Sequence, residues 1–243
     1  DIVIANGRIM DPESCLDMVG SIGIANGIIK EITDGVLNAA EIINAEGMVV
    51  SPGFIDLHCH PQDLEIFEVQ ARDGVTTTLE LEIGTGDIDE WYGRWEGKAA
   101  VNFGASVGHV PARMQVMNDP GIFVPSGDAG RRVGTCSEVE DIKKLVVEGL
   151  NKGALAVGFG LDYTPAASHW EIIEMFRIAA EHRASCHVHL RGRGQKGPRN
   201  AIEALGEVIA ASAITGASLH VVHINSTGMG GVPQLLEMIK GAR

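Results

Sequence analysis

The sequence is short of positive charge. Its 243 residues include 19 lysines and arginines against 32 aspartates and glutamates, which gives a net charge of −13. A chain this acidic is a poor partner for the backbone of a nucleic acid or for an anionic membrane surface. We therefore expect no nucleic-acid or membrane partner, and a small molecule is the better candidate ligand.

Cysteines and long apolar runs are also scarce. The four cysteines form no C-x-x-C pair and are widely spaced, at Cys15, Cys59, Cys136 and Cys186. This favours reduced thiols inside the cell over a disulfide framework. No apolar run approaches the roughly 20 residues that span a bilayer, and the N-terminus has no signal-peptide pattern. We expect a cytoplasmic protein, and the start at Asp1 indicates a trimmed chain or a segment of a longer one.

Two regions differ in their sequence pattern. Residues 1–52 contain short apolar stretches broken by Asn6-Gly7, Asn26-Gly27 and Glu46-Gly47, which is typical of hairpins. They predict a small β domain, either a sandwich or an open sheet. Residues 53–243 alternate apolar strands with amphipathic helices, and the expected strands lie near residues 54–59, 75–81, 101–107, 154–159, 184–189 and 217–224.

The second region predicts a barrel. Strands that alternate with helices imply a parallel sheet, and a series of such units most often closes into a (β/α)8 TIM-type barrel. Two helices begin with the S-x-x-E pattern of a capping box, Ser137 with Glu140 and Ser168 with Glu171. Only six strand units are found, whereas a complete barrel takes about 250 residues. The predicted fold class is therefore α/β, an incomplete barrel of about six βα units whose open edges invite another copy or a complementing chain.

The first barrel strand carries a possible metal site. His58 and His60 lie one residue apart in Phe54-Ile55-Asp56-Leu57-His58-Cys59-His60. Because side chains alternate along a strand, both imidazoles point the same way and can reach one divalent ion. A single buried histidine is more often a hydrogen-bonded core residue than a ligand. The prediction therefore depends on further ligands at the ends of later strands.

Later strands supply such ligands. The second strand ends in Glu80-Leu81-Glu82, and two carboxylates on one face would be costly to bury without a cation. Glu82 is the first choice because it lies nearer the strand end, and the alternative is a solvated residue at a strand edge. The fifth strand ends at His189 and the sixth at His223, which we prefer over His187 and His220 as ligands. Imidazole and carboxylate ligands suit zinc, so we expect one or two Zn²⁺ ions.

Substrate-binding residues are expected in the loops at the same end. Arg191 begins a basic, glycine-rich loop with Arg193, Lys196 and Arg199, and its guanidinium is suited to pair with a substrate carboxylate. A solvated loop is the alternative. His109 lies either near the substrate or at the cap of a turn. The segment 109–136 is too long for an ordinary connection and predicts either a lid or a disordered excursion.

Several motifs resemble the amidohydrolase superfamily. The opening resemblance lies in residues 24–29, 43–47 and 50–60. The narrower resemblance is to the N-acyl-D-amino-acid deacylase (D-aminoacylase) branch, and it lies in residues 107–109 with Arg113, in residues 160–165 and in residues 189–191.

The resemblance implies a ligand set and a substrate residue. It places one metal on His58 and His60 and a neighbouring metal on His189 and His223. The strand-two cysteine of the branch and the strand-four lysine of many relatives have no counterpart, which favours Glu80 or Glu82 as the bridge. Tyr163 matches the substrate-side tyrosine of the branch. The aspartate that relatives carry on strand eight lies outside the six units, so no catalytic residue is assigned.

The implied activity is hydrolysis of the amide of an N-acyl amino acid by water activated at the metal. The D and L configurations of the amino acid are both left open. One alternative is a cyclic-amide hydrolase similar to dihydroorotase or hydantoinase. Another is a non-catalytic fragment that needs a partner chain, because the seventh and eighth strands and the proton-shuttling aspartate are missing.

Overall fold

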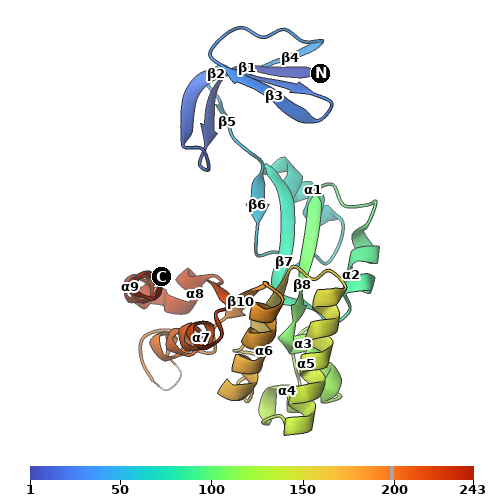
Figure 1. The fold of residues 1–243 in the computed structure, drawn as a ribbon, viewed down its shortest axis with the longest axis vertical. Helices are drawn as coiled ribbons and strands as arrows, with labels where there is room; N and C mark the ends of the chain where they lie inside the picture. The colour runs from blue at the N-terminus through green and yellow to red at the C-terminus, as the bar shows by residue number, and fades with distance from the viewer. Residues whose placement is uncertain (198–199) are drawn as a thin grey trace. The chain divides into compact units, whose positions relative to one another are not determined.

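The computed structural model describes residues 1–197 and 200–243, so Arg199 of the basic loop lies outside the described residues. The chain divides into two compact units, Asp1–Phe54 and Ile55–Arg243. Figure 1 labels the helices and strands of both units. None of the helices in the described part has the length and apolar character needed to traverse a bilayer.

The first unit is a single five-stranded sheet. Its strand order is β3-β2-β1-β4, with β5 also paired to β1. The strands are β1 (Ile2–Asp11), β2 (Leu16–Ala25), β3 (Ile28–Thr33), β4 (Glu41–Asn44) and β5 (Val49–Val50). Because only one sheet is present among the described residues of this unit, it corresponds to the open sheet of the two predicted forms.

Only one of the three predicted turn dipeptides closes a hairpin. Asn26 and Gly27 both have positive φ, 54° and 71°, and they join the antiparallel strands β2 and β3. Asn6-Gly7 is instead a bulge inside β1, where the pairing with β2 shifts register. Glu46-Gly47 joins β4 and β5, which both run parallel to β1. The hairpin prediction was wrong at these two positions, because such a dipeptide also fits a bulge inside a strand, as at Asn6-Gly7, or a turn between two strands that each pair with a third, as at Glu46-Gly47.

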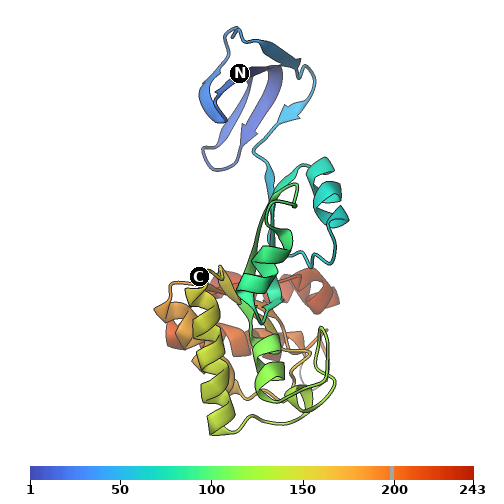
Figure 2. The same cartoon turned by 90° about the vertical axis from the view of Figure 1, so that its right-hand side faces the viewer.

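The second unit is built on a six-stranded curled sheet of order β11-β10-β9-β8-β7-β6, in which each register given between neighbours from β7 to β11 is parallel (Figure 1 and Figure 2). Its strands are β6 (Phe54–Asp56), β7 (Val75–Thr85), β8 (Asn102–Gly108), β9 (Ala156–Gly160), β10 (Ser185–His189) and β11 (Ser218–Val221). The α/β class and the half-barrel with six strands are confirmed.

Helices connect successive strands of this sheet. They are α1 (Glu65–Arg72), α2 (Ile88–Trp95), α3 (His109–Val116), α4 (Asp128–Arg131), α5 (Cys136–Asn151), α6 (His169–Glu181), α7 (Ala201–Thr215), α8 (Ile224–Gly228) and α9 (Val232–Ala242), with a 3₁₀ turn at Met229–Gly231. Helices α5, α6 and α7 lie side by side (Figure 1). Their fully buried Ile142, Phe176 and Leu205 pack against the buried strands β9 and β10, which makes this the main core of the unit.

The two predicted helix caps had different outcomes. Helix α5 begins two residues earlier than predicted, because Thr135 and Glu138 form the capping box and Ser137 lies inside the helix. Ser168 does cap α6 by accepting a hydrogen bond from the Glu171 backbone N–H at 3.1 Å. The side chain of Glu171, however, points into the protein interior.

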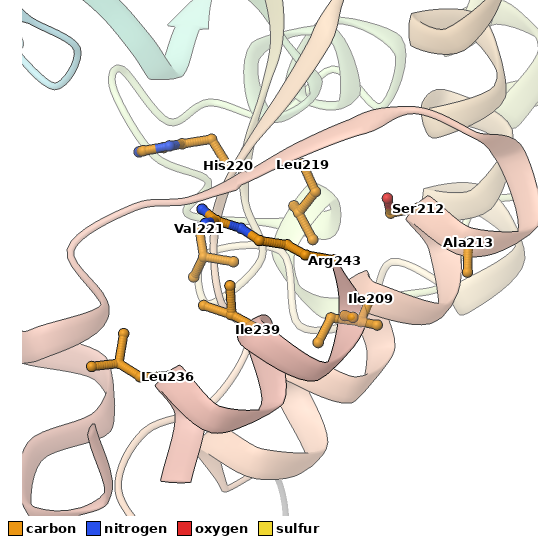
Figure 3. A pocket seen from close by; sticks show the side chains of 10 residues that line it. Ile209, Ser212, Ala213, Leu219, His220, Val221, Leu236, Ile239 and Arg243 are labelled. Carbon is orange, nitrogen blue, oxygen red and sulfur yellow. The ribbon is translucent and has the colours of Figure 1, made fainter. Parts of the chain in front are cut away.

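A groove lies beside the edge strand β11. It has a volume of about 440 Å³ between β11, α7 and α9, and its apolar lining includes Ile209, Leu219, Val221, Leu236 and Ile239 (Figure 3). Ser212, His220 and Arg243 add polar groups to the lining. The predicted ligand histidines are not part of this lining, so the groove and the histidine cluster are separate features.

Candidate metal centre

Glu82 is the centre of a cluster of four histidines. It lies on β7 and is 2% exposed. Its Oε2 atom lies 3.1 Å from Nε2 of both His58 and His60. Its Oε1 atom lies 2.5 Å from Nδ1 of His189 and 3.5 Å from Nε2 of His223. Each carboxylate oxygen therefore faces one pair of imidazoles.

The histidines reach Glu82 from the carboxyl ends of three strands. His189 is the last residue of β10, and His223 follows β11 by two residues. The sequence predicted His58 and His60 on a strand. They lie just beyond the end of β6, whose last residue is Asp56. His58 stays next to β7 through an isolated antiparallel bridge to Glu80. The carboxyl ends of parallel strands are where barrel enzymes build their sites.

His223 has an unusual backbone. Its φ of 32° and ψ of 47° are left-handed, a conformation that costs a non-glycine residue about 1–3 kcal/mol. The hydroxyl groups of Ser226 and Thr227 lie 3.3 and 3.4 Å from its Nδ1 atom. The Nε2 atom therefore faces the cluster, 3.1 Å from Nδ1 of His189.

The electrostatics of the cluster favour a cation. Burial would raise the pKa of the Glu82 carboxyl, but hydrogen bonds with His189 and His60 hold it well below its ordinary value. Burial would lower the pKa of His60, but its contacts with Glu80 and Glu82 raise it to about 10. Within residues 1–197 and 200–243, no lysine or arginine forms an ion pair with either carboxylate. The ion-pair partners of the two carboxylates are therefore histidines.

The donor set fits a divalent metal. Two groups of three residues could each hold an ion, because the ligand atoms within each group lie within 4.8 Å of one another. One group is His58, His60 and Glu82, and the other is Glu82, His189 and His223. Nitrogen and oxygen ligands of this kind suit zinc. Because Glu82 belongs to both groups, the arrangement offers two adjacent candidate sites that share this carboxylate.

Tyr163 is the predicted substrate residue that lies beside the cluster. Its ring centroid is 5.0 Å from that of His189. Burial, followed by the charge of Glu82, raises the pKa of its phenol. The phenol therefore keeps its proton at neutral pH and can donate a hydrogen bond.

Arg191 is engaged elsewhere. Its Nε and Nη2 atoms donate to the two oxygens of Glu207 at 3.0 and 2.8 Å, and both side chains are buried. Its Nη1 atom donates to the backbone carbonyl of Pro165 at 2.8 Å. The guanidinium therefore holds the loop next to Tyr163, and its donors are engaged by groups of the protein itself. The sequence could not indicate Glu207 as its partner, because it lies 16 residues further along.

His109 belongs to a different cluster, which is fully buried. Its Nε2 atom donates to Glu171 Oε1 at 2.8 Å, and Arg113 Nη1 donates to the two oxygens of Glu171 at 2.6 and 2.5 Å. The Arg113 Nε atom also donates to the carbonyl of Ala129 at 2.6 Å. His109 was considered as a substrate-side residue or a turn cap. The structure instead places it in this charge cluster between α3 and α6.

The segment 109–136 adds an aromatic residue that the sequence reasoning missed. The Phe123 ring centroid is 5.6 Å from that of His60. The loop before α4 is closed by Asp119, whose carboxylate accepts hydrogen bonds of 2.9–3.0 Å from the backbone N–H groups of four residues, Gly121, Ser126, Gly127 and Ala129. The sequence signal for Phe123 is an aromatic residue within this long connecting segment.

The buried cluster gives a prediction for pH dependence. Burial would raise the pKa of Glu171, but His109 and Arg113 lower it from 4.5 to about 2. A depressed carboxyl pKa stabilises the fold above the unfolded pKa, and this contribution is lost as the pH falls through the folded pKa. We expect Glu171→Gln to lower the free energy of unfolding at pH 6. The difference in this free energy between wild type and variant should become smaller as the pH falls from about 4.5 to 2. Urea unfolding of both proteins across this range measures the difference, and a constant difference would contradict the assignment.

Comparisons with known proteins show similarity to amidohydrolases. Residues 41–107 match the family described as "Amidohydrolase family". The D-aminoacylase of Alcaligenes xylosoxydans xylosoxydans is 26% identical over 231 residues, which cover 80% of this chain and 45% of that protein. The dihydroorotase of Streptococcus pneumoniae serotype 4 is 45% identical over 93 residues, which cover 35% of this chain and 22% of that protein.

A solved structure has the same fold. The N-acyl-D-glutamate deacylase from Bordetella bronchiseptica, complexed with zinc and a phosphonate inhibitor, has a TM-score of 0.80 and 23% identity. The match covers 100% of this chain and 56% of that one. These findings confirm the resemblance to amidohydrolases and the barrel fold. The chain spans about half the length of the D-aminoacylase and the deacylase that it matches.

Proposed function

We propose that this relative of the amidohydrolases carries the metal centre of a hydrolase that cleaves the amide of an N-acyl amino acid, with zinc as the metal. The observation that carries the proposal is the position of Glu82, whose two oxygens each face a pair of histidines. The D-aminoacylase and deacylase relatives support the choice of substrate, and the zinc in the deacylase structure supports the choice of metal.

In this proposal the ligands form two sets. His58 and His60 would hold one ion together with Glu82, and His189 and His223 would hold the other, also with Glu82. Glu82 takes the place of the cysteine or carboxylated lysine expected from other members. Divalent ions bound there supply Lewis-acid polarisation of the amide carbonyl and activation of water.

The residues around the ions orient the substrate. Tyr163, with its phenol proton retained, donates a hydrogen bond to a carbonyl or carboxylate oxygen of the substrate beside His189. Arg191 keeps this loop in place through its bonds to Glu207 and to the Pro165 carbonyl. Phe123 places an apolar ring beside His60 in a T-shaped contact.

A cyclic-amide hydrolase is the second candidate. The 45% identity to a dihydroorotase favours it, although that match covers only 35% of this chain. Assays of the full-length protein on N-acyl-D-amino acids, N-acyl-L-amino acids, dihydroorotate and hydantoins distinguish the two candidates. Turnover of the ring substrates alone would exclude the deacylase proposal. Native mass spectrometry of the same protein tests whether a second copy or another chain takes part.

His223→Ala tests the ligand assignment. We expect the variant to retain one metal ion of two and to lose hydrolytic activity, because the alanine removes a nitrogen donor from the Glu82 Oε1 side. Elemental analysis after dialysis measures the metal, and a hydrolysis assay measures activity. His169→Ala is the matched control, because the His169 side chain is 77% exposed. Unchanged metal content in His223→Ala would remove this residue from the site.

A further inference from the structure

Glu80 is the second buried carboxylate of the cluster, and its contacts differ from those of Glu82. It is 4% exposed and lies two residues before Glu82 on β7. Its Oε1 atom accepts a hydrogen bond from the backbone N–H of Gly84 at 3.2 Å. Its Oε2 atom contacts His60 Nδ1. Glu80 therefore binds the far side of one imidazole, whereas Glu82 faces all four.

A bulge in β7 fixes the position of Glu80. Glu80 pairs with Ala105 and Thr85 with Val107, so the six residues 80–85 of β7 lie opposite the three residues 105–107 of β8. Gly84 lies within this bulge with a φ of +68°, and a Cβ atom there would lie 2.4 Å from Ser106 Oγ and 2.6 Å from Ser106 O. Position 84 thus requires glycine. Its left-handed backbone directs the N–H group to the Glu80 carboxylate.

The contact with Glu80 determines which nitrogen of His60 is free. A carboxylate at Nδ1 accepts the proton of that nitrogen, so Nε2 is the nitrogen that gives up its proton when a metal binds. The Nε2 atom of His60 is the one that faces Glu82, at 3.1 Å. The neighbouring His58 has no such support, because its buried Nδ1 atom has no hydrogen-bond partner among the described residues.

We propose that Glu80 is a positioning residue that fixes the tautomer and orientation of His60 and is not itself the bridging ligand. This inference rests on the proposed metal centre. Glutamate is required for the role, because two N–H donors, of Gly84 and His60, face its two acceptor oxygens. A glutamine has one acceptor oxygen and leaves one of these donors without a partner.

Zinc titration of the metal-free full-length protein tests the inference. We expect Glu80→Gln to weaken one of the two zinc sites by about 10–100-fold and to leave the other unchanged. Retention of the second ion at His189 and His223 shows that the variant is folded. The control is Glu68→Gln on α1, whose side chain is 63% exposed. In ¹⁵N spectra of the zinc-loaded proteins, the wild type shows His60 protonated at Nδ1 only, and Glu80→Gln loses this signature.

The outcomes separate this inference from the proposal on which it rests. If Glu80→Gln binds both ions as tightly as the wild type, Glu80 has no positioning role and the metal centre still stands. If it loses both ions while keeping its fold, Glu80 acts as a bridge and the inference is wrong. If the wild type binds no zinc at all, the metal centre and the inference both fail.

Discussion

Glu82→Gln is expected to lose both metal ions and all measurable hydrolysis. Glutamine keeps the size of the side chain but removes its charge, and only one oxygen remains to serve two pairs of histidines. The shared position of Glu82 means that both sites lose a ligand in one substitution. The loss of zinc affinity should exceed the roughly 10–100-fold effect typical of a residue that only orients a ligand.

Elemental analysis and zinc titration measure this effect, and a hydrolysis assay follows activity. Glu140→Gln is a suitable control, because Glu140 lies on α5 with a side chain that is 61% exposed. A Glu82→Gln protein that retains two tightly bound ions would show that the carboxylate is not shared between them. Loss of a single ion would assign Glu82 to one pair of histidines only.

Arg113→Met is expected to lower the free energy of unfolding by about 3–5 kcal/mol, because it leaves the buried Glu171 carboxylate without its cation. Arg113 and Glu171 are both 0% exposed. The substitution also removes the hydrogen bond to the Ala129 carbonyl, which holds the segment that carries Phe123. Urea unfolding at neutral pH measures the change in stability.

The control for this prediction is Arg131→Met, the same substitution at an exposed arginine of α4. The double variant Arg113→Met with Glu171→Leu should recover part of the lost stability, because it removes the unpaired charge together with its partner. A loss below about 1 kcal/mol in Arg113→Met, the scale of an exposed pair, would contradict the structural role given to this cluster.

The sequence predicted those features that depend on local pattern. Strand–helix alternation indicated the barrel, and the ends of strands indicated His189, His223 and Glu82, which the structure brings together. Their role as ligands remains a proposal. The choice of Glu82 over Glu80 as the bridge followed from its position nearer the strand end, and the contacts of the two carboxylates support that order.

Features that depend on distant partners could not be predicted from the sequence. Glu171 matched a capping pattern with Ser168, and its backbone does take part in that cap, but its side chain pairs with Arg113, 58 residues away. Arg191 begins a basic, glycine-rich loop that is typical of anion binding, yet its guanidinium pairs with the carboxylate of Glu207. Local pattern cannot show which charged residues meet after folding, so both arginine sites became clear only from the structure.

The backbone at His223 makes this position suited to redesign of metal selectivity. Asparagine and aspartate tolerate the left-handed conformation better than other non-glycine residues do, whereas valine or isoleucine would clash. Aspartate at this position would therefore exchange a nitrogen donor for an oxygen donor without forcing the chain to refold locally. Oxygen-rich coordination suits harder ions such as manganese, so we expect His223→Asp to shift the metal preference of the proposed centre toward such ions.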